Sequence, residues 1–560
     1  MSERRRAPIA LLRTGVPGLD EILGGGLPEY SFNLIAGTPG AGKTTLAHQI
    51  IFSNATPERP ALYLTVLGEP PIKMLRYQQQ MDYFDPDKVG ESIHFVDLSA
   101  LALSGDLEAV LARIIGHIEE INPAIVVVDS FQTILRKAGA ETTELHLQGF
   151  VQRLAVHLTS WEATTFLIAE SPMAVEDAIY TVADGIFWLS QNVERNSVVR
   201  KVQIVKSRGQ APMPGLHTFR ITVNGIELFP RLQMPTEPTS RSLPRARISS
   251  GVESLDELMG GGIAAGDSVL VSGPSGAGKS VLGAQFIATG VRHGEPGIIA
   301  VFEERPTEYM FRAKSLGFDL EEMVERGDLQ VIYLRPLDLS PDETLQEIRS
   351  AVARIGAKRV VIDSLSGFEL ALAPTFRMDF RESLYRLVTA LTGTGVTVLM
   401  TMEIVQSYTD LQFSPYVISF LADDIILLRY VEIAGLLRKS LVVVKMRGSD
   451  HSKEMRAYEI TAHGLVVRES LREYRGISTG MAELRAGADL PVYPGLITQE
   501  ETVLHALFAL GEATVDAVIR RTGIEEIAVT RALDRIVALS YASQRGNGAR
   551  TAYRPIARAQ

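Results

Sequence analysis

The chain contains the stretch Gly273-Pro-Ser-Gly-Ala-Gly-Lys-Ser280, which follows an apolar run at 268–272 and precedes a helix-like run at 281–289. It fits the P-loop pattern G-x-x-x-x-G-K-[ST], in which glycines let backbone N–H groups curl around a phosphate. The N-terminus of the following helix adds partial positive charge. Lys279 would reach the β- and γ-phosphates, and Ser280 would be a ligand of Mg²⁺. The stretch therefore predicts a nucleotide site.

The same arrangement occurs twice. The segment 14–26 reappears as 250–262, and the same offset carries without a gap into a second P-loop, Gly37-Thr-Pro-Gly-Ala-Gly-Lys-Thr44. Self-similarity of this length marks a duplicated domain. Each copy alternates strand-like and helix-like segments, so we expect an α/β fold with mostly parallel sheets and helices on both faces.

The two P-loops and the residue after each define the predicted ATP-binding positions. They are Gly37, Thr38, Pro39, Gly40, Ala41, Gly42, Lys43, Thr44 and Thr45 in the first copy, and Gly273, Pro274, Ser275, Gly276, Ala277, Gly278, Lys279, Ser280 and Val281 in the second.

An apolar run ending in Asp-Ser follows each P-loop, at Asp129 and at Asp363. Four consecutive apolar residues indicate a buried central strand. A carboxylate at its C-terminal end would lie beside the P-loop and hold Mg²⁺ directly or through water. An aspartate that merely starts a turn is the alternative. We predict metal ligands at Thr44, Asp129, Ser280 and Asp363.

Between these landmarks, the second copy has the strand-like run 299–302 followed by Glu303 and Glu304. A carboxylate pair at a strand end can supply a general base that deprotonates an attacking water or hydroxyl. A solvated acidic turn is the plain alternative. The first copy has Gly68-Glu69 at this place, so we interpret one carboxylate as replaced by glycine.

Two cations close a later strand in each copy, Lys206 with Arg208 and Lys445 with Arg447. Cations that bracket one residue on a strand point the same way. This suits a γ-phosphate reached from a neighbouring subunit, and an ordinary charged strand exit is the alternative.

Composition narrows the class of protein. The 560 residues are 46% apolar and 22% charged, which is typical of a soluble globular chain, and no apolar run is long enough to span a membrane. No signal peptide is recognisable, so we expect a cytoplasmic protein. Without cysteine, disulfides and thiolate chemistry are excluded. The net charge of −10 disfavours a chain-wide nucleic-acid surface.

Proline-rich and irregular stretches set the predicted domain boundaries. We expect a first ATP-binding domain at 1–235, a linker at 236–248, a second domain at 249–485, a linker at 486–498 and a small module at 499–560. The module has three helix-like segments and two short strand-like ones around Gly-Asn-Gly, the pattern of a winged helix-turn-helix. Its arginines barely outnumber its acids, so DNA and protein both remain possible partners.

With these motifs in place, the chain resembles the KaiC-like ATPases of the RecA superfamily over roughly residues 10 to 475. The segments 422–432 and 445–449 are especially like the second KaiC domain. The resemblance implies two tandem RecA-like P-loop domains, a homohexameric ring with ATP at subunit interfaces, slow hydrolysis and, in clock members, self-phosphorylation in the second tier.

The resemblance also implies roles for individual residues. Glu303 corresponds to the general base and Glu304 to its partner, and Lys445 and Arg447 reach the neighbour's nucleotide. Arg377 occupies the place of an arginine finger. Where clock proteins have a phosphorylated Ser-Thr pair, this chain has Ser419-Phe420, with Ser414 at a further hydroxyl position. One acceptor of the pair is kept and one is lost.

The first copy departs from this pattern, because the segment 147–150 has no arginine at the finger position. We therefore expect ATP binding in both domains, with Mg²⁺, and hydrolysis mainly in the second, with serine autophosphorylation and a regulatory role. A recombinase-like DNA motor and a nucleotide-gated scaffold with little catalysis are the alternatives.

Overall fold

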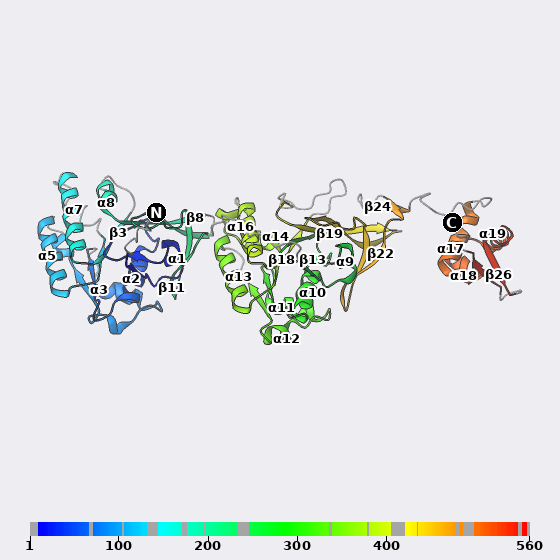
Figure 1. The fold of residues 1–560 in the computed structure, drawn as a ribbon, viewed down its shortest axis with the longest axis horizontal. Coiled ribbons are helices and arrows are strands. Elements are labelled where there is room, and N and C mark those ends of the chain that lie inside the picture. The colour runs from blue at the N-terminus through cyan, green and yellow to red at the C-terminus, as the bar shows by residue number, and fades with distance from the viewer. Residues whose placement is uncertain are drawn as a thin grey trace, which may run out of the picture. The chain divides into compact units, whose positions relative to one another are not determined.

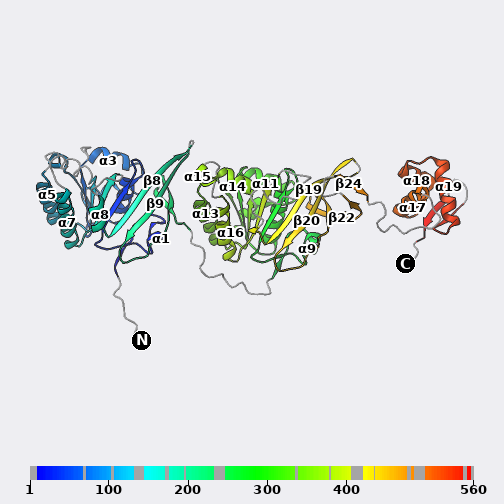
Figure 2. The same cartoon turned by 90° about the horizontal axis from the view of Figure 1, so that it is seen from above.

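The computed structural model describes residues 9–66, 71–102, 106–130, 144–170, 176–194, 197–231, 246–334, 339–377, 380–404, 420–433, 435–475, 481–484, 498–546 and 551–556. Two sheets carry the two copies of the repeat, and helices lie on both faces of each sheet (Figures 1 and 2).

The first domain is built on a nine-stranded sheet of order β11-β10-β9-β8-β3-β7-β6-β4-β5. The strands from β5 to β8 along this order are parallel to their neighbours, and the sheet continues from β8 to β11 with antiparallel pairs. The strands are β3 (Phe32–Gly37), β4 (Ala61–Thr65), β5 (Ile93–Asp97), β6 (Ile125–Asp129), β7 (Thr164–Glu170), β8 (Gly185–Glu194), β9 (Ser197–Ser207), β10 (His217–Thr222) and β11 (Gly225–Phe229).

The helices of the first domain are α1 (Leu19–Leu23), α2 (Lys43–Asn54), α3 (Pro71–Gln78), α4 (Ser99–Ala102), α5 (Leu107–Ile121), α7 (Glu144–Ser160) and α8 (Glu176–Val182), with a 3₁₀ turn at Pro86–Lys88. A short pair, β1 (Leu11–Leu12) and β2 (Leu27–Pro28), precedes the sheet.

The second domain repeats this plan with the order β16-β15-β17-β18-β14-β19-β20-β21-β22. The strands are β14 (Ser268–Gly273), β15 (Gly297–Val301), β16 (Leu329–Tyr333), β17 (Arg359–Asp363), β18 (Thr397–Glu403), β19 (Asp424–Ile433), β20 (Leu436–Met446), β21 (Arg456–Thr461) and β22 (Gly464–Ser470). Short strands lie at β12 (Arg247–Ile248), β13 (Ile263–Ala264), β23 (Tyr474–Arg475) and β24 (Met481–Leu484).

The helices of the second domain are α9 (Glu253–Leu258), α10 (Lys279–Arg292), α11 (Pro306–Lys314), α12 (Leu320–Glu325), α13 (Pro341–Ile355), α14 (Leu365–Ala371), α15 (Pro374–Arg377) and α16 (Phe380–Gly393). Because successive strand residues point to opposite faces, β17 places Val361 in the core under α10, and Val360 and Ile362 in the core under α13 and α16. Both faces of the sheet are thus buried, which explains the continuous apolar runs of its central strands.

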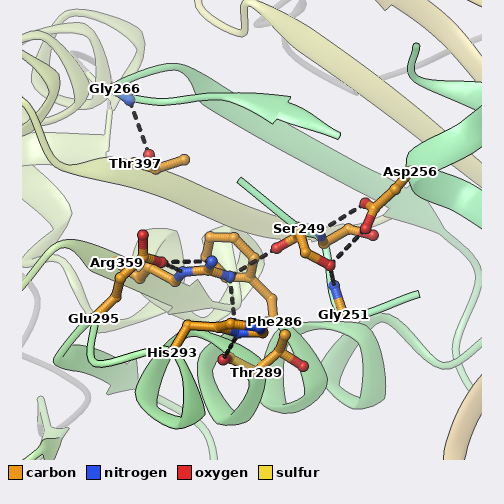
Figure 3. Close-up of polar contacts among 11 residues, drawn as sticks. Ser249, Gly251, Asp256, Gly266, Phe286, Thr289, His293, Glu295, Arg359 and Thr397 are labelled. Atoms are coloured by element: carbon orange, nitrogen blue, oxygen red, sulfur yellow. Dashed lines mark hydrogen bonds and ion pairs between the residues drawn. The ribbon is translucent and has the colours of Figure 1, made fainter. Parts of the chain in front are cut away.

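One charged side chain lies inside this second core. Arg359, at the start of β17, is 2% exposed; its guanidinium donates to Glu295 at 2.7 Å and to the carbonyl oxygens of Ser249 and Phe286 at 2.8 and 2.9 Å (Figure 3). The same group lies over the Phe286 ring, 4.5 Å from its centre. The buried charge is therefore fully partnered, as a charge in a low-dielectric core must be. Gly290 leaves room for it, because a Cβ there would come within 2.4 Å of the Arg359 side chain.

The C-terminal residues form a separate compact unit with its own apolar core. It contains α17 (Thr498–Leu510), β25 (Ala513–Thr514), α18 (Val515–Thr522), α19 (Glu526–Ala538), β26 (Ala542–Arg545) and β27 (Ala552–Pro555). The strands form an antiparallel sheet of order β25-β27-β26. This element order is the one that the winged-helix interpretation predicts, and the assignment stays a prediction.

Across the described ranges, no helix combines the length and the apolar character that crossing a bilayer requires. The predicted class, two tandem α/β P-loop domains with mostly parallel sheets and helices on both faces, is confirmed. The exact domain and linker boundaries stay predictions.

Candidate functional site

The second P-loop connects the end of β14 to the start of α10. Gly276 and Gly278 have φ of 73° and 97°, a region in which a side chain would be strained, and a Cβ on Gly278 would also approach Ile460 to 2.8 Å. Lys279 folds back over the loop, and its Nζ donates to the carbonyl oxygens of Gly273 and Pro274, each at 2.9 Å. The lysine is held at the mouth of the loop, where the phosphates of a nucleotide would bind.

A cavity of about 530 Å³ opens in front of this loop. It is lined by the predicted residues Ser275, Gly276, Gly278, Lys279, Ser280, Val281, Glu303, Glu304 and Asp363, together with Arg312, Ser364, Glu403 and Ile460, which sequence reasoning did not assign to the site. A volume of this size accommodates a nucleotide-sized ligand.

The two adjacent glutamates at this cavity have different partners. Glu303 accepts a hydrogen bond of 2.8 Å from the Ser364 hydroxyl, and that hydroxyl also accepts from the backbone N–H of Gly367 at the start of α14. Glu304 is held by both terminal nitrogens of Arg312, at 2.8 and 2.5 Å. A bidentate pair with arginine fixes the position of a carboxylate. Glu303 is therefore the carboxylate of the pair that is available to a substrate water.

Asp363 ends β17 beside the P-loop strand. One of its oxygens, Oδ1, accepts from Thr401 at 2.5 Å, and the other, Oδ2, is buried and has no hydrogen-bond partner among the described residues. A buried carboxylate oxygen without a donor is costly unless a cation or water meets it. With the Ser280 hydroxyl lining the same cavity, the oxygen donors fit Mg²⁺, which prefers such hard ligands and keeps several waters.

The first P-loop site repeats this geometry. The Lys43 Nζ donates to the carbonyl oxygens of Gly37 and Thr38, each at 3.0 Å. The Thr44 hydroxyl donates to Asp129 Oδ2 at 2.9 Å, and Tyr63 donates to the same oxygen at 2.6 Å. Burial raises the pKa of Asp129, and the hydrogen bonds from Tyr63 and Thr44 oppose that rise. The predicted metal ligands Thr44 and Asp129 thus already lie within hydrogen-bond distance of each other.

Strand register corrects the alignment of the catalytic glutamates. Thr65, the end of β4, pairs with Asp129, and Val301, the end of β15, pairs with Asp363. Counting on from these equivalent positions, Glu303 corresponds to Leu67, and Gly68 corresponds to Glu304. The interpretation that one carboxylate of the pair survives in the first copy is therefore wrong. Glu69 falls one position later, and residues 67–70 lie outside the described part of the chain.

The predicted cation pairs lie toward the end of each sheet that is opposite the P-loop. Lys445 is paired with Ile425 near the start of β19, whose following residues run parallel to β14 toward the P-loop. The Lys445 Nζ donates to the Ala422 carbonyl at 2.7 Å, and Arg447 pairs with Asp423 at 3.2 Å. In the first copy, Lys206 donates to the carbonyl oxygens of Tyr180 and Thr181, and Arg208 pairs with Asp184. Neither pair can therefore reach the P-loop of its own domain.

Arg377 ends α15, and its guanidinium donates to the carbonyl oxygens of Leu372 and Leu370 at 3.2 and 2.9 Å. It does not line the cavity of its own P-loop. Ser419 and Ser414 lie outside the described residues, so their predicted role has no structural account.

A further carboxylate ends the strand next to each P-loop strand. Glu403 pairs in register with Gly273, and Glu170 pairs with Gly37. Burial lowers the pKa of Lys279, and the opposing effect of Glu403 exceeds that of Asp363 and of Glu303. Sequence reasoning missed these residues, although the repeat itself carries the signal, because both glutamates end apolar strand-like runs at corresponding positions.

Comparison with known proteins agrees with this geometry. The sequence model of the KaiC ATPase family matches residues 12–233 and 248–472. The chain is 32% identical over 482 residues to the circadian clock oscillator protein KaiC of a Picosynechococcus strain, covering 84% of this chain and 92% of that protein.

Two further relatives give similar figures. The circadian clock oscillator protein KaiC of Thermostichus vulcanus is 30% identical over 492 residues, covering 86% of this chain and 93% of the relative. KaiC 1 of a Synechocystis strain is 31% identical over 488 residues, covering 85% and 92%. The P-loops, the strand-end carboxylates and the match across both sheets lead to one conclusion: the chain belongs to the KaiC family of ATPases.

Proposed function

We propose that this KaiC-like ATPase binds ATP in both domains and hydrolyses it mainly in the second, with Glu303 as the general base. The observation that carries the proposal is the difference between the adjacent carboxylates. Glu303 lines the same cavity as Lys279, and its carboxylate accepts a hydrogen bond from the Ser364 hydroxyl. Glu304, in contrast, is fixed by two hydrogen bonds from Arg312.

The residues of this site would have separate roles in hydrolysis. The P-loop amides and Lys279 would hold the β- and γ-phosphates, and Ser364 would aim Glu303 at the attacking water. Bound Mg²⁺, held by Ser280 and Asp363, would neutralise charge that develops on the phosphate oxygens. Glu303 would then take the proton of the water as its oxygen approaches the γ-phosphorus.

The position of the cation pairs supports assembly into a homohexameric ring. Lys445 and Arg447 lie toward the end of the sheet opposite their own P-loop, so a nucleotide that they contact must belong to another subunit. The same holds for Lys206 and Arg208 in the first domain. Arg377, outside its own cavity, would act on a neighbour's nucleotide in the same way.

We further propose slow autophosphorylation on Ser419 and a regulatory role, with the C-terminal unit as the docking module. The exposed residues at the start of α19 are Glu525, Glu526 and the 69% exposed Ile527. Two carboxylates at the end of the helix that would meet phosphates disfavour DNA and favour a protein partner.

Steady-state phosphate release tests the central proposal. General-base catalysis is worth about 10²–10⁴-fold, so Glu303→Gln should lower turnover at least tenfold with ATP binding intact. Glu469→Gln, on an exposed carboxylate paired with Arg438, is the matched control. Full activity of Glu303→Gln would place the chemistry elsewhere.

Two further measurements address assembly and phosphorylation. Size-exclusion chromatography with and without ATP should show a nucleotide-dependent hexamer. Phosphopeptide mapping after incubation with Mg-ATP should place the label on Ser419. Label on Ser414 alone would move the site, and the absence of any label would leave hydrolysis as the reaction.

A further inference from the structure

Glu403 and Glu170 occupy the same place in the two domains. Each is the last residue of the strand that lies between the P-loop strand and the strand of the metal-site aspartate, and each pairs in register with the first P-loop glycine. The two copies share this carboxylate although they differ at the position of Glu303, which is Leu67 in the first copy.

The strand register brings each carboxylate to the start of its P-loop. Glu403 is paired with Gly273, whose carbonyl oxygen accepts a hydrogen bond from the Lys279 Nζ. Glu170 is paired with Gly37, whose carbonyl oxygen accepts a hydrogen bond from the Lys43 Nζ. Glu403 also lines the cavity that holds Lys279 and Ser280.

A carboxylate next to a phosphate site is unfavourable unless a proton or a water lies between them. A water that donates a hydrogen bond to the carboxylate and directs its oxygen at the γ-phosphorus removes that conflict. Simple charge balance for the buried lysine is the competing explanation. The two explanations differ in what they do to kcat and KM.

We propose that Glu403 and Glu170 each hold the attacking water in their own domain, and that Glu170 supports slow hydrolysis in the first domain, which lacks a counterpart of Glu303. The inference rests on the proposed ATPase function and adds a catalytic carboxylate to each site.

The step balances as an ordinary hydrolysis. The water oxygen forms a bond to the γ-phosphorus while the bond from that phosphorus to the bridging oxygen breaks, and its electron pair leaves with ADP. The proton released by the water passes to Glu303 in the second domain or to Glu170 in the first, and from there to the product phosphate. Glu403 keeps the water in line.

Kinetics of the full-length chain test the second domain. Glu403→Gln should lower kcat at least tenfold and leave KM for ATP within about twofold, since a neutral amide orients the water less well. Glu469→Gln is again the control, and binding of a fluorescent ATP analogue reports whether the site is intact. A normal kcat with a lowered KM would show that Glu403 only balances the charge of Lys279, and this result would overturn the proposal.

The first domain is tested in the Glu303→Gln background, where its own turnover remains. Adding Glu170→Gln should reduce that residual rate at least a further fivefold, while each chain still binds two nucleotides. A residual rate that Glu170→Gln leaves unchanged, or the lack of any residual rate, would overturn the first-domain part. A wild-type chain that binds ATP and releases no phosphate would instead refute the proposed function itself.

Discussion

The two P-loop domains share one scaffold and differ in the groups that act on it. Both hold the lysine on two loop carbonyls and end the strand beside the loop in a glutamate. Both set an aspartate at the end of the next strand. The second domain adds Glu303, where the first has Leu67. The duplication preserves the backbone geometry of the P-loop, whereas the side chain at the position of Glu303, the proposed general base, differs between the copies.

The domains also differ in what they bury. Arg359, the first residue of β17, corresponds to Ile125, the first residue of β6. The two positions are equivalent because Arg359 pairs with the first residue of β15 and Ile125 pairs with the first residue of β4. Asp424 begins β19 where Gly185 begins β8. In the first domain, Asn33 fills the space beside Gly185, because a Cβ there would come within 2.2 Å of its Oδ1. At these two positions the second domain thus carries a buried charged residue that the first lacks.

Removing each P-loop lysine gives the largest contrast. Hydrogen bonds to charged groups are worth about 1.5–3 kcal/mol each, so Lys279→Ala should lower kcat/KM by about 100-fold or more. Lys43→Ala should change second-domain turnover little and impair ring assembly, because we propose that hydrolysis occurs mainly in the second domain and expect ATP in the first domain to act mainly as a structural ligand. Phosphate release and size-exclusion chromatography with ATP measure both effects. An unchanged oligomer from Lys43→Ala would contradict the assembly role.

The buried arginine offers a test of stability. Arg359→Ala removes every partner of Glu295 in this cluster and should destabilise the second domain by about 3–5 kcal/mol. Arg359→Ile, the residue of the first copy, should cost less because it fills part of the space. Gly290→Ala should be tolerated only with Arg359→Ile, since the added Cβ would collide with the arginine side chain. Denaturant melts of the four variants would reveal the coupling, and additive effects would refute it.

Asp424 makes the second domain sensitive to pH. Burial, with the charges of Asp267 and Asp423, raises the pKa of this carboxyl to about 7, against the opposing charge of Arg247. The folded domain then binds a proton that the unfolded chain has released, so stability falls as pH rises from about 4 to about 7. Asp424→Asn should remove this loss, which amounts to roughly 2–3 kcal/mol between pH 5 and pH 8.

Thermal melts across that range compare the wild type with Asp424→Asn. The variant should gain on the wild type as pH rises, and a constant gap between them would contradict the prediction. Asp267→Asn is the matched variant: it removes one repelling charge and should shift the pH-dependent loss to lower pH.

The smallest expected effect comes from restoring a carboxylate to the first domain. In the Glu303→Gln background, Leu67→Glu should raise residual phosphate release by about two- to threefold. The gain should be small because the first domain has no arginine at the finger position, so a restored base recovers little of its full effect. Gly68→Glu, at the position of Glu304, is the control and should leave the rate unchanged. A larger gain from Gly68→Glu would restore the alignment that strand register overturned.

Much of this protein follows from local sequence. The P-loops, the repeat, the strand-end aspartates and the class of fold could be predicted because each depends on a few consecutive residues with a fixed backbone requirement. The lysine, hydroxyl and aspartate of each site were found for the same reason, and the structure brings them together.

The resemblance already named Glu303 as the base and Glu304 as its partner, but only the tertiary structure showed the physical difference between them, because their partners, Ser364 and Arg312, come from other elements. It also brought Glu403 and Glu170 to the P-loops and put Lys445 toward the opposite end of the sheet. These placements depend on which strands are neighbours and in what register, and parallel strands are joined across long crossovers that local pattern does not encode. The sequence determined which chemical groups the chain carries, and long-range strand pairing decided which of them meet.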